Sequence, residues 1–287
     1  MIKKAGIATL IIILLSFALW SFVWYRTKHE NHFLSVTFFN VGQGDSSLIR
    51  FRDGEKMLVD CGPDKKVLQK LGKYLSTSDR TIDYMLITHF DLDHYGGCVD
   101  VLKRYDVKHI ITNGYPKPSD SYWVSWNETA QKENADFKVI NTRESWVIAS
   151  TTLDFFSPNP HLILSPSEDT ANNHSIVFRL ADETQNVSIL FSGDIEEPTE
   201  KQLIEEFCEP SKSKCPALQA SVLKVAHHGS DTSSSKNFLE AVHPEKAIIS
   251  VGKFNKFGHP SLRVIRRLER FPVQVLRTDI NDDIILK

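Results

Sequence analysis

The sequence contains few cysteines, and no two of them form a CxxC pair. The four cysteines are Cys61, Cys98, Cys208 and Cys215, and their spacing indicates neither a thiolate zinc knuckle nor a thioredoxin-type redox motif. Cys208 and Cys215 bracket a short polar loop, which suits an extracytoplasmic disulfide as well as it suits two free thiols. A low-complexity linker is also missing from residues 33–287. We therefore expect one domain there, although two half-domains that share a site would give the same pattern.

A strong excess of one charge is absent too. Lys and Arg number 34 and Asp and Glu number 36, so the formal net charge is −2. Without Lys3 and Lys4, which precede the apolar N-terminal segment, 32 basic residues face 36 acidic ones and the net charge is −4. A polyanionic partner would have to meet a local basic patch, because the overall field does not attract it.

A long uncharged segment does occur at the N-terminus. Residues 5–25, AGIATLIIILLSFALWSFVWY, contain no charged side chain, and about 20 apolar residues span a bilayer as a helix. Bulky aromatic residues stand where a cleaved signal peptide would have its small-residue cleavage site. We expect residues 1–28 to be a signal anchor with one transmembrane helix; a cleaved signal peptide is the alternative. Lys3 and Lys4 favour a cytoplasmic N-terminus, so we expect a single-pass membrane protein whose soluble domain, residues 29–287, lies outside the cytoplasm.

Apolar periodicity along the rest of the chain indicates alternating strands and helices. β-Branched and aromatic runs bounded by turn residues predict strands at 33–41, 46–51, 56–62, 82–89, 107–112, 175–180, 187–194, 221–229 and 246–252. Helical spacing of apolar residues predicts helices at 67–75, 128–134, 198–207 and 261–271. Two runs of strands with interspersed helices favour an α/β fold in which two sheets pack together with helices outside, an αββα sandwich.

Ionisable residues directly follow three of the predicted strands. They are His89, Asp91, Asp93 and His94 in ITHFDLDH, Asp194 in FSGD, and His227 and His228 in VAHHG. Their side chains would project into one crevice if these strands lie side by side. A single His at a strand end, or an Asp in a turn, is usually unremarkable. Four titratable groups within six residues are different, because they would repel or desolvate one another without a cation.

The same residue types are ligands of divalent metal ions. Imidazole and carboxylate groups suit Zn²⁺ and, with more oxygen, Mn²⁺. In an extended loop His89, Asp91 and Asp93 share one side while His94 turns to the other, so one loop can serve two ions. Asp194 is the natural bridge between ions about 3.5–4 Å apart. The pattern therefore predicts a dinuclear metal site.

The motifs resemble a known family. ITHFDLDH followed by two glycines is similar to the metal loop of the metallo-β-lactamase superfamily, whose general pattern is H-x-H-x-D-H. More closely, FFNVGQGDSSLI, LVDCG, ITHFDLDHYGG, ILFSGD and LKVAHHGSDTSS, with FGHPS near the end, resemble the extracytoplasmic metallo-β-lactamase-like domain of the ComEC family of DNA-uptake competence proteins. The likeness spans about residues 33–265. It implies a metallo-β-lactamase-like αββα hydrolase domain over residues 29–287.

The resemblance also implies a ligand set and catalytic roles. The implied ligands of two divalent metal ions, Zn²⁺ or Mn²⁺, are His89, Asp91, Asp93, His94, Asp194 and His227. In this assignment Asp194 bridges the ions and Asp93 also orients the nucleophile. His228 or His259 supports the leaving group, and the roles of His227 and His228 are interchangeable at this stage.

Two features depart from the superfamily pattern. Asp91 stands where most members have a second His ligand of the first metal ion. A carboxylate oxygen, which is a harder ligand than an imidazole nitrogen, makes Mn²⁺ a rival to Zn²⁺ at that ion. The superfamily also has a further His ligand of the first metal ion, and this sequence shows no clear counterpart to it. His174 in NNHSIVF lies in a suitable region, but a chance His in an Asn-rich turn is the other interpretation.

A basic stripe is the main indication of substrate. Arg263, Arg266, Arg267 and Arg270 fall at i, i+3, i+4 and i+7 of the helix expected over 261–271, so they share one face. They could bind phosphates, or they could be the solvated face of an amphipathic helix. With the resemblance, the stripe favours a phosphodiesterase or nuclease that acts on DNA and is linked to DNA uptake (competence).

Two other functions fit the same sequence. One is a hydrolase of a small substrate, such as a phosphorylcholine ester, a lactone or a β-lactam. The other is a non-catalytic nucleic-acid-binding subunit. The ComEC proteins also carry a multi-helix channel domain, whereas one candidate helix is present here, so we expect any DNA transport to need a separate channel protein as partner.

Overall fold

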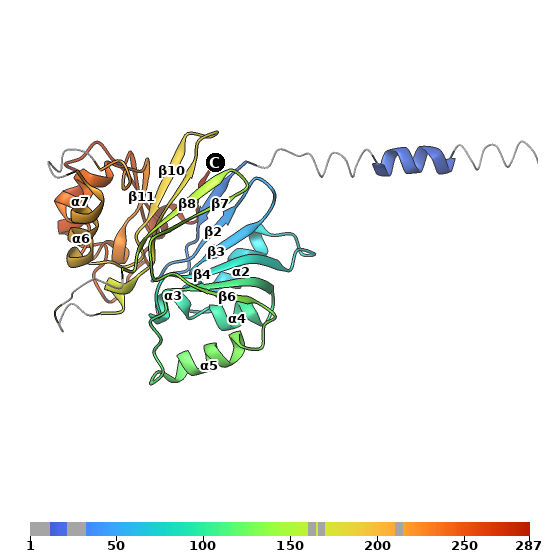
Figure 1. Ribbon diagram of the computed structural model, residues 1–287, viewed down its shortest axis with the longest axis horizontal. Coiled ribbons are helices and arrows are strands. Elements are labelled where there is room, and N and C mark those ends of the chain that lie inside the picture. The colour runs from blue at the N-terminus through green and yellow to red at the C-terminus, as the bar shows by residue number, and fades with distance from the viewer. Residues whose placement is uncertain (1–11, 22–32, 160–164, 166–169, 210–214) are drawn as a thin grey trace, which may run out of the picture. The chain divides into compact units, whose positions relative to one another are not determined.

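The structure separates into two compact units. This computed structural model describes residues 12–21, 33–159, 165, 170–209 and 215–287, and its units are Met1–Phe33 and Leu34–Lys287. Residues 12–21 of the first unit form a helix (Figure 1), and the large apolar side chains of this helix are exposed. Within the described ranges, no helix is long and apolar enough to cross a membrane. The anchor expected over residues 1–28 falls largely outside these ranges and stays a prediction.

The first sheet of the larger unit has an antiparallel and a parallel part. Its strand order is β14 (Ile284–Leu286), β1 (Ser35–Phe38), β2 (Ser47–Arg50), β3 (Lys56–Val59), β4 (Thr81–Ile87), β5 (Asp106–Thr112) and β6 (Asp136–Val139). Neighbours from β14 to β3 are antiparallel, and those from β3 to β6 are parallel. The parallel strands therefore deliver their following loops to one edge.

The second sheet repeats this division. Its order is β13 (Gln274–Arg277), β12 (Lys246–Ile249), β11 (Val222–Lys224), β10 (Val187–Phe191), β9 (Val177–Asp182), β8 (Thr151–Ser157) and β7 (Glu144–Ile148). Pairing is antiparallel from β7 to β10 and parallel from β10 to β13.

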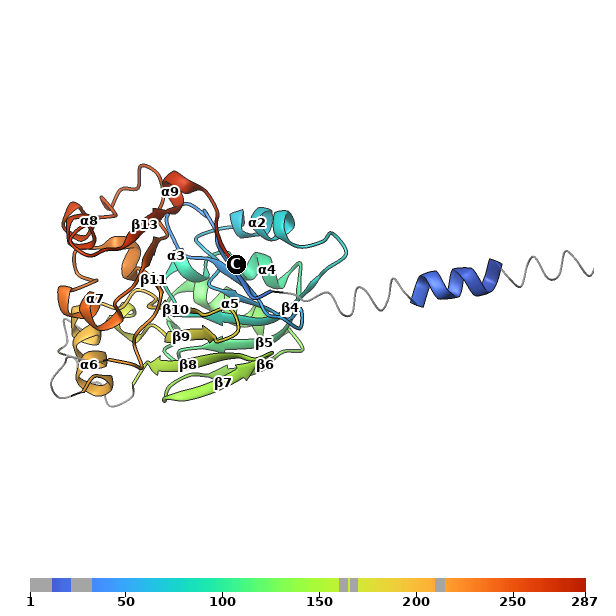
Figure 2. The same cartoon turned by 90° about the horizontal axis from the view of Figure 1, so that it is seen from above.

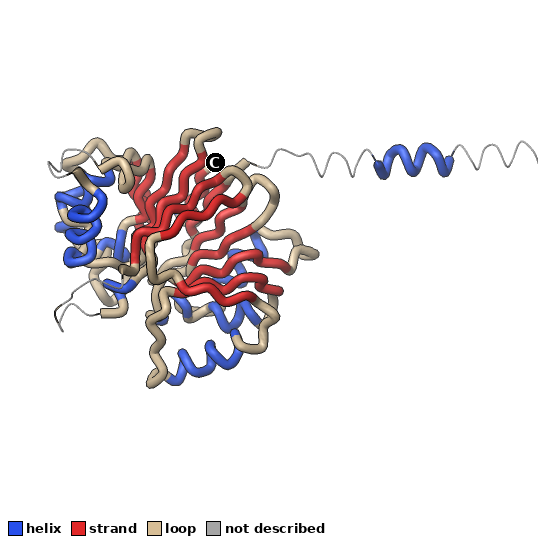
Figure 3. The backbone as a smooth tube through the Cα atoms, viewed as in Figure 1, coloured by secondary structure: helices blue, strands red, loops and turns tan. Residues whose placement is uncertain are grey.

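Helices cover the outer faces of the two sheets (Figures 1 and 2). Beside the first sheet lie α2 (Lys66–Tyr74), α4 (Cys98–Leu102) and α5 (Ser121–Ala130); beside the second lie α6 (Glu197–Phe207), α7 (Lys236–Val242) and α8 (Leu262–Leu268). Short helical turns are α3 (Leu92–Tyr95), η1 (Asn172–His174), η2 (Ala226–Gly229) and α9 (Thr278–Asn281). Figure 3 shows the two sets of strands stacked between helices.

The buried side chains form one apolar cluster at each interface between layers. On β2, Leu48 packs toward the helices, whereas its neighbour Ile49 packs between the sheets, as the period of two in a strand requires. Leu190 and Ile189 divide in the same way on β10. Strands buried on both faces read as continuous apolar runs. The predicted αββα sandwich is thus confirmed.

The segment between β5 and β8 differs most from prediction. The helix expected over 128–134 instead begins at Ser121, because the side chain of Asp120 accepts a hydrogen bond of 2.8 Å from the backbone N–H of Tyr122 and caps the first turn. Helix α5 buries Trp126 but exposes Val124, so its apolar residues lack a clear helical period. Strand β7, with alternating partly exposed residues, was not expected.

Two disulfides join the four cysteines. Cys208 and Cys215 are bonded, which settles the choice between a disulfide and free thiols. A second bond, which the sequence had not indicated, links Cys61 after β3 with Cys98 at the start of α4. The residues between them include the whole ITHFDLDH stretch, so this disulfide closes the loop that carries it.

Removal of the longer disulfide should cost more stability. Closing a loop restricts the unfolded chain more as the loop lengthens, and the bonded cysteines are 37 and 7 residues apart. We expect Cys61→Ala/Cys98→Ala to lower the free energy of unfolding by about 4 kcal/mol and Cys208→Ala/Cys215→Ala by about 2 kcal/mol. Denaturant titration of both double variants measures this difference; a larger loss in the second variant would contradict it.

A buried carboxyl group fixes the loop between η2 and α7. Glu200 on α6 is fully buried and accepts hydrogen bonds from the backbone N–H groups of Ser234 and, at 2.8 Å, Ser235. Burial raises the pKa of Glu200 to about 7, although these two hydrogen bonds oppose the shift. The folded chain therefore binds this proton more tightly than the unfolded chain, in which the group titrates near 4.5.

The stability contributed by protonated Glu200 should be complete below about pH 4.5 and be lost as pH rises through about 7. Glu200→Gln cannot ionise, so the difference in unfolding free energy between the variant and the native chain should shift by about 3 kcal/mol in favour of the variant from pH 4.5 to pH 8. Urea titrations of both proteins at the two pH values measure it. A difference that does not change with pH would show that Glu200 titrates normally.

Candidate metal centre

Residues that follow strands of both sheets meet at one edge of the sandwich. His94 lies on α3 after β4 of the first sheet, while Asp194 and His228 follow β10 and β11 of the second. Together with Asp45, which precedes β2, they are buried and each places one ligand atom within 4.8 Å of the others. We call this group the buried centre.

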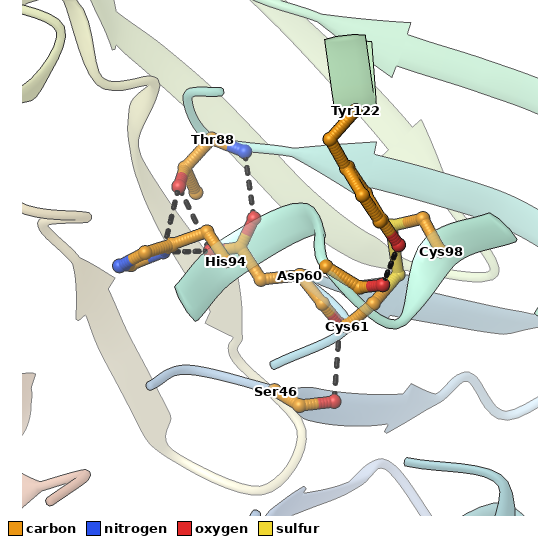
Figure 4. The surroundings of a disulfide bond; sticks show 8 residues. Ser46, Asp60, Cys61, Thr88, His94, Cys98 and Tyr122 are labelled. Atoms are coloured by element: carbon orange, nitrogen blue, oxygen red, sulfur yellow. Dashed lines mark hydrogen bonds and ion pairs between the residues drawn. A yellow bond between two sulfur atoms is a disulfide. The ribbon is translucent and has the colours of Figure 1, made fainter. Parts of the chain in front are cut away.

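The ring of His94 is held between carboxylates from the two sheets. Its Nδ1 lies 2.8 Å from Asp60 Oδ2, and its Nε2 lies 3.2 Å from Asp194 Oδ2. Asp60 also accepts hydrogen bonds of 2.8 Å from the backbone N–H and the hydroxyl of Thr88 (Figure 4). With Nδ1 as the donor to Asp60, Nε2 is directed at Asp194 and available to a metal ion.

His228 is oriented in the same manner. Its Nδ1 lies 3.0 Å from the Ser250 carbonyl oxygen and 3.2 Å from Asp45 Oδ1. Its Nε2 lies 3.1 Å from Asp93 Oδ2 and 3.3 Å from Asp194 Oδ2. Both nitrogen atoms are therefore engaged inside the buried centre.

The two adjacent histidines adopt left-handed backbone conformations, with φ of 48° at His227 and 53° at His228. Such angles are uncommon outside glycine and cost free energy. Because of this conformation the rings diverge: His228 is buried, whereas the side chain of His227 is 23% exposed and its Nδ1 lies 3.5 Å from Glu196 Oε1. The sequence analysis placed His227 among the ligands and His228 beside the leaving group; the structure puts His228 in the buried centre.

Asp45 is a member of the buried centre that the sequence analysis missed. Its Oδ2 lies 2.5 Å from the ammonium of Lys224, and both side chains are buried. The turn before it is tightly packed: a Cβ on Gly44 would lie 2.2 Å from the carbonyl oxygen of Asp93, and Gly44 has a φ of 139°. The glycines of NVGQGDS thus allow this turn to contact the loop that carries ITHFDLDH. These two glycines are the sequence signal that could have identified Asp45.

The buried centre strongly favours positive charge. Burial alone would lower the pKa of His228, but Asp194, Asp45 and Asp93 raise it to about 10. Burial likewise opposes protonation of His94, yet Asp194 and Asp60 hold its pKa well above the usual value. A bound metal ion supplies positive charge in place of these protons, since His ligates as the neutral ring.

Several buried atoms also fit a metal ion. Across the described ranges, His89 Nε2 and Asp194 Oδ1 are buried without a hydrogen-bond partner, although buried polar atoms are normally bonded. Nitrogen and carboxylate donors of this kind suit Zn²⁺ or Mn²⁺. The buried centre is thus a possible metal site; the identity and number of the ions stay predictions.

The other residues expected at the first site lie nearby. His89 is fully buried, with Nδ1 3.2 Å from the Ser175 hydroxyl and Nε2 3.7 Å from Asp91 Oδ2. Asp91 is partly exposed and forms an ion pair with Lys117. His174 stacks on Tyr115 with ring centroids 3.8 Å apart.

A pocket of about 360 Å³ opens above the buried centre. Its lining includes Asp91, Asp93, Lys117, Asp194, His227 and Phe257. The ring of half-buried His259 lies 5.6 Å from that of His227. The four arginines expected to bind substrate lie around α8, where all of them line a different hollow.

Comparison with known proteins identifies the family. The model of the metallo-beta-lactamase superfamily matches residues 39–253, and the chain belongs to this superfamily. It is 29% identical over 268 residues to ComE operon protein 3 of Bacillus subtilis, covering 87% of this chain and 32% of that protein. It is 27% identical over 263 residues to competence protein ComA of Neisseria gonorrhoeae, covering 91% of this chain and 33% of that protein. The predicted resemblance to competence proteins is confirmed, and the chain spans about a third of each relative.

Solved structures agree on the fold. The metallo-beta-lactamase fold protein YhfI from Bacillus subtilis matches with a TM-score of 0.57 and 13% identity, covering 88% of this chain and 99% of that one. At this identity the match supports the architecture alone.

Asp60 should control metal affinity through His94 without being a ligand. Asp60→Asn removes the charge that orients the ring, and loss of such a partner typically weakens metal binding tenfold to hundredfold. Competition with a chromophoric zinc chelator measures the affinity. Asp182→Asn is the matched control, because Asp182 is a buried carboxylate paired with Arg52 at 3.0 Å. Equal affinities of the Asp60→Asn variant and the control would contradict the assigned role.

Proposed function

We propose that this chain is a metal-dependent phosphodiesterase that cleaves DNA and acts in DNA uptake. The observation that carries the proposal is the convergence of four buried His and Asp ligands, with unpartnered atoms of His89 and Asp194 beside them, beneath an open pocket. The similarity to two proteins named for competence supports DNA as the substrate.

The proposed ligands fall into two groups. His94, His228 and Asp194 belong to the buried centre, and His89, Asp91 and Asp93 adjoin it. Two bound Zn²⁺ or Mn²⁺ ions would activate a water nucleophile near neutral pH and neutralise charge on the phosphoryl oxygens. Asp194 would be a ligand shared by the ions, since its Oδ2 lies 3.2 Å from His94 Nε2 and 3.3 Å from His228 Nε2.

Asp93 is the residue best placed to orient the nucleophile. It lines the pocket, and its side chain is 32% exposed. Burial raises its pKa, but the hydrogen bond to His228 and the charge on His94 outweigh burial, so the pKa lies below its usual value. Asp93 is therefore ionised and able to accept a hydrogen bond from an attacking water.

The leaving group is best supported by His227 or His259. His228, the first candidate, has both ring nitrogens engaged in the buried centre. His227 faces the pocket with Nδ1 near Glu196. Burial and the nearby His227 and His228 lower the pKa of His259, so its ring is neutral at pH 7 and can donate one hydrogen bond.

We also propose a location and a partner. Attachment to a membrane through residues 1–28, with the hydrolase domain outside the cytoplasm, is supported by two disulfides, which persist mainly in oxidising compartments. The partner that we propose for DNA transport is a channel protein.

Hydrolysis should depend on metal and on Asp93. The full chain, stripped with EDTA and reloaded with Mn²⁺ or Zn²⁺, is expected to cleave end-labelled DNA and bis(p-nitrophenyl) phosphate. Asp93→Ala should lower kcat/KM at least about a hundredfold, because it removes a ligand that also orients the nucleophile. Asp136→Ala is the control, since Asp136 on β6 is exposed.

The outcomes separate the candidate functions. Cleavage of the small diester without cleavage of DNA would indicate a small phosphodiester substrate. Turnover of a lactone alone would indicate a different reaction. A metal-loaded chain without any turnover would contradict the enzymatic proposal.

A further inference from the structure

A loop between β12 and α8 exposes two phenylalanines beside lysines. Phe254 is 94% exposed and Phe257 is 56% exposed. The ammonium of Lys253 lies 5.3 Å from the Phe254 ring centroid, and that of Lys256 lies 5.1 Å from the Phe257 ring centroid. Large aromatic side chains exposed together commonly mark an interaction site.

Asn255 holds this loop in one shape. Its Nδ2 donates to the carbonyl oxygens of Gly252 at 2.9 Å and His259 at 2.6 Å. Its Oδ1 accepts from the backbone N–H groups of Phe257 at 3.1 Å and His259 at 3.0 Å. The aromatic rings are therefore presented to solvent by a loop that is closed on itself, which lowers the entropy lost when a ligand stacks on them.

The chain passes from this loop directly into a basic groove between α7 and α8. The groove has a volume of about 570 Å³ and is lined by Lys236, Glu240, Leu262, Arg263, Arg266, Arg267, Arg270 and Phe271. Arg267 is held by the carbonyl oxygens of Ser233, at 3.0 Å, and Ser234. In the described structure Arg266 and Arg270 have no ion-pair partner, and Arg263 has only a loose contact of 3.9 Å with Asp231.

The loop borders the pocket above the buried centre, and α8 begins a few residues after the loop. Phe257 lines that pocket. The backbone N–H of Ser261, just before α8, donates at 2.8 Å to the carbonyl oxygen of Gly229 in the HHG turn. Phe257 and the start of α8 therefore both lie next to the site, which is where a chain-like ligand would leave the pocket.

We propose that loop 252–258 and the α7–α8 groove form one platform for single-stranded nucleic acid, with bases stacked on Phe254 and Phe257 and phosphates bound by Arg263, Arg266 and Arg270. This deepens the proposed function and rests on it, because it names the form of the substrate and its path to the buried centre. It also gives the four-arginine stripe a specific role: Arg267 supports the loop after η2, and the other three arginines face the ligand.

Charge and spacing agree with this ligand. The chain as a whole is acidic, with a net charge of −2, so a local set of free arginines selects an anionic partner. Arg263, Arg266 and Arg270 line the same groove, so they can contact successive phosphates of one strand. Exposed rings can stack only on bases that are not already stacked in a duplex, which favours a single strand. A concave groove suits a strand better than it suits a flat membrane.

Binding without turnover tests the platform. The full chain in neutral detergent, with EDTA present so that no hydrolysis occurs, is titrated into fluorescein-labelled 12-nucleotide single strands, the matching duplex and an abasic 12-mer, and anisotropy is recorded at several salt concentrations. Three variants are compared: Phe254→Ala, Arg266→Glu/Arg270→Glu and, as a charge-matched control on the exposed residues after α4, Lys103→Glu/Arg104→Glu.

We expect the native chain to bind the single strand more tightly than the duplex or the abasic strand. Phe254→Ala should weaken single-strand binding by about fivefold to a hundredfold and leave duplex binding unchanged. Arg266→Glu/Arg270→Glu should weaken it at least tenfold and make the slope of log K against log salt shallower by about 1.4. The control variant should bind like the native chain.

Other results would overturn the proposal. Equal binding of the abasic and normal strands, with no effect of Phe254→Ala, would exclude base stacking. Binding to phosphatidylglycerol nanodiscs that depends on Arg266 and Arg270, without oligonucleotide binding, would identify a membrane surface instead. Because the titrations contain EDTA, they test binding separately from hydrolysis. The hydrolysis assay can fail while the titrations confirm the platform, and hydrolysis can be confirmed while the titrations exclude the platform.

Discussion

The hydrogen-bonded ring of His94 joins the two halves of the sandwich. Asp60 follows β3 of the first sheet and Asp194 follows β10 of the second, and the ring lies between them at 2.8 Å and 3.2 Å. Two buried carboxylates on either side of a fully buried imidazole favour a positive charge between them, and either a proton or a metal ion can supply it. Three other features hold this edge in place: Thr88 donates a hydrogen bond to Asp60, the Cys61–Cys98 bond closes the loop, and the left-handed backbone of His227 and His228 directs His228 inward.

Sequence patterns predicted the architecture because the sheets are buried on both faces. Runs such as MLV in β3 and ILF in β10 supply side chains to two apolar clusters at once, and such runs are recognisable without a structure. Helix α5 was misplaced because its start depends on one capping carboxylate, that of Asp120, rather than on apolar periodicity. Strand β7 lies at the edge of its sheet with partly exposed side chains, and its pattern is correspondingly weak.

The site was predictable where its residues are neighbours in sequence and obscure where they are not. His89, Asp93 and His94 lie within one short stretch and attract attention together. Asp60 and Lys224, by contrast, lie in stretches that carry the family resemblance, LVDCG and LKVAHHG. They act through partners distant in sequence, His94 and Asp45, so their roles could not be read from those stretches. Which of two adjacent histidines enters the buried centre depends on backbone angles that only glycine adopts freely, so the order of the letters could not decide it.

The pairing of β1 with β14 has a consequence for how the protein folds. Val36 lies opposite Leu286, and Asp283, just before β14, accepts a hydrogen bond of 2.9 Å from the backbone N–H of Asn40. The turn that carries Asp45 follows directly after Asn40, so its approach path is fixed by residues at the far end of the chain. Contacts of such large sequence separation form late and slowly. Until they form, β1 presents an unpaired edge that invites association with other chains, so β14 also protects the folding chain against such association.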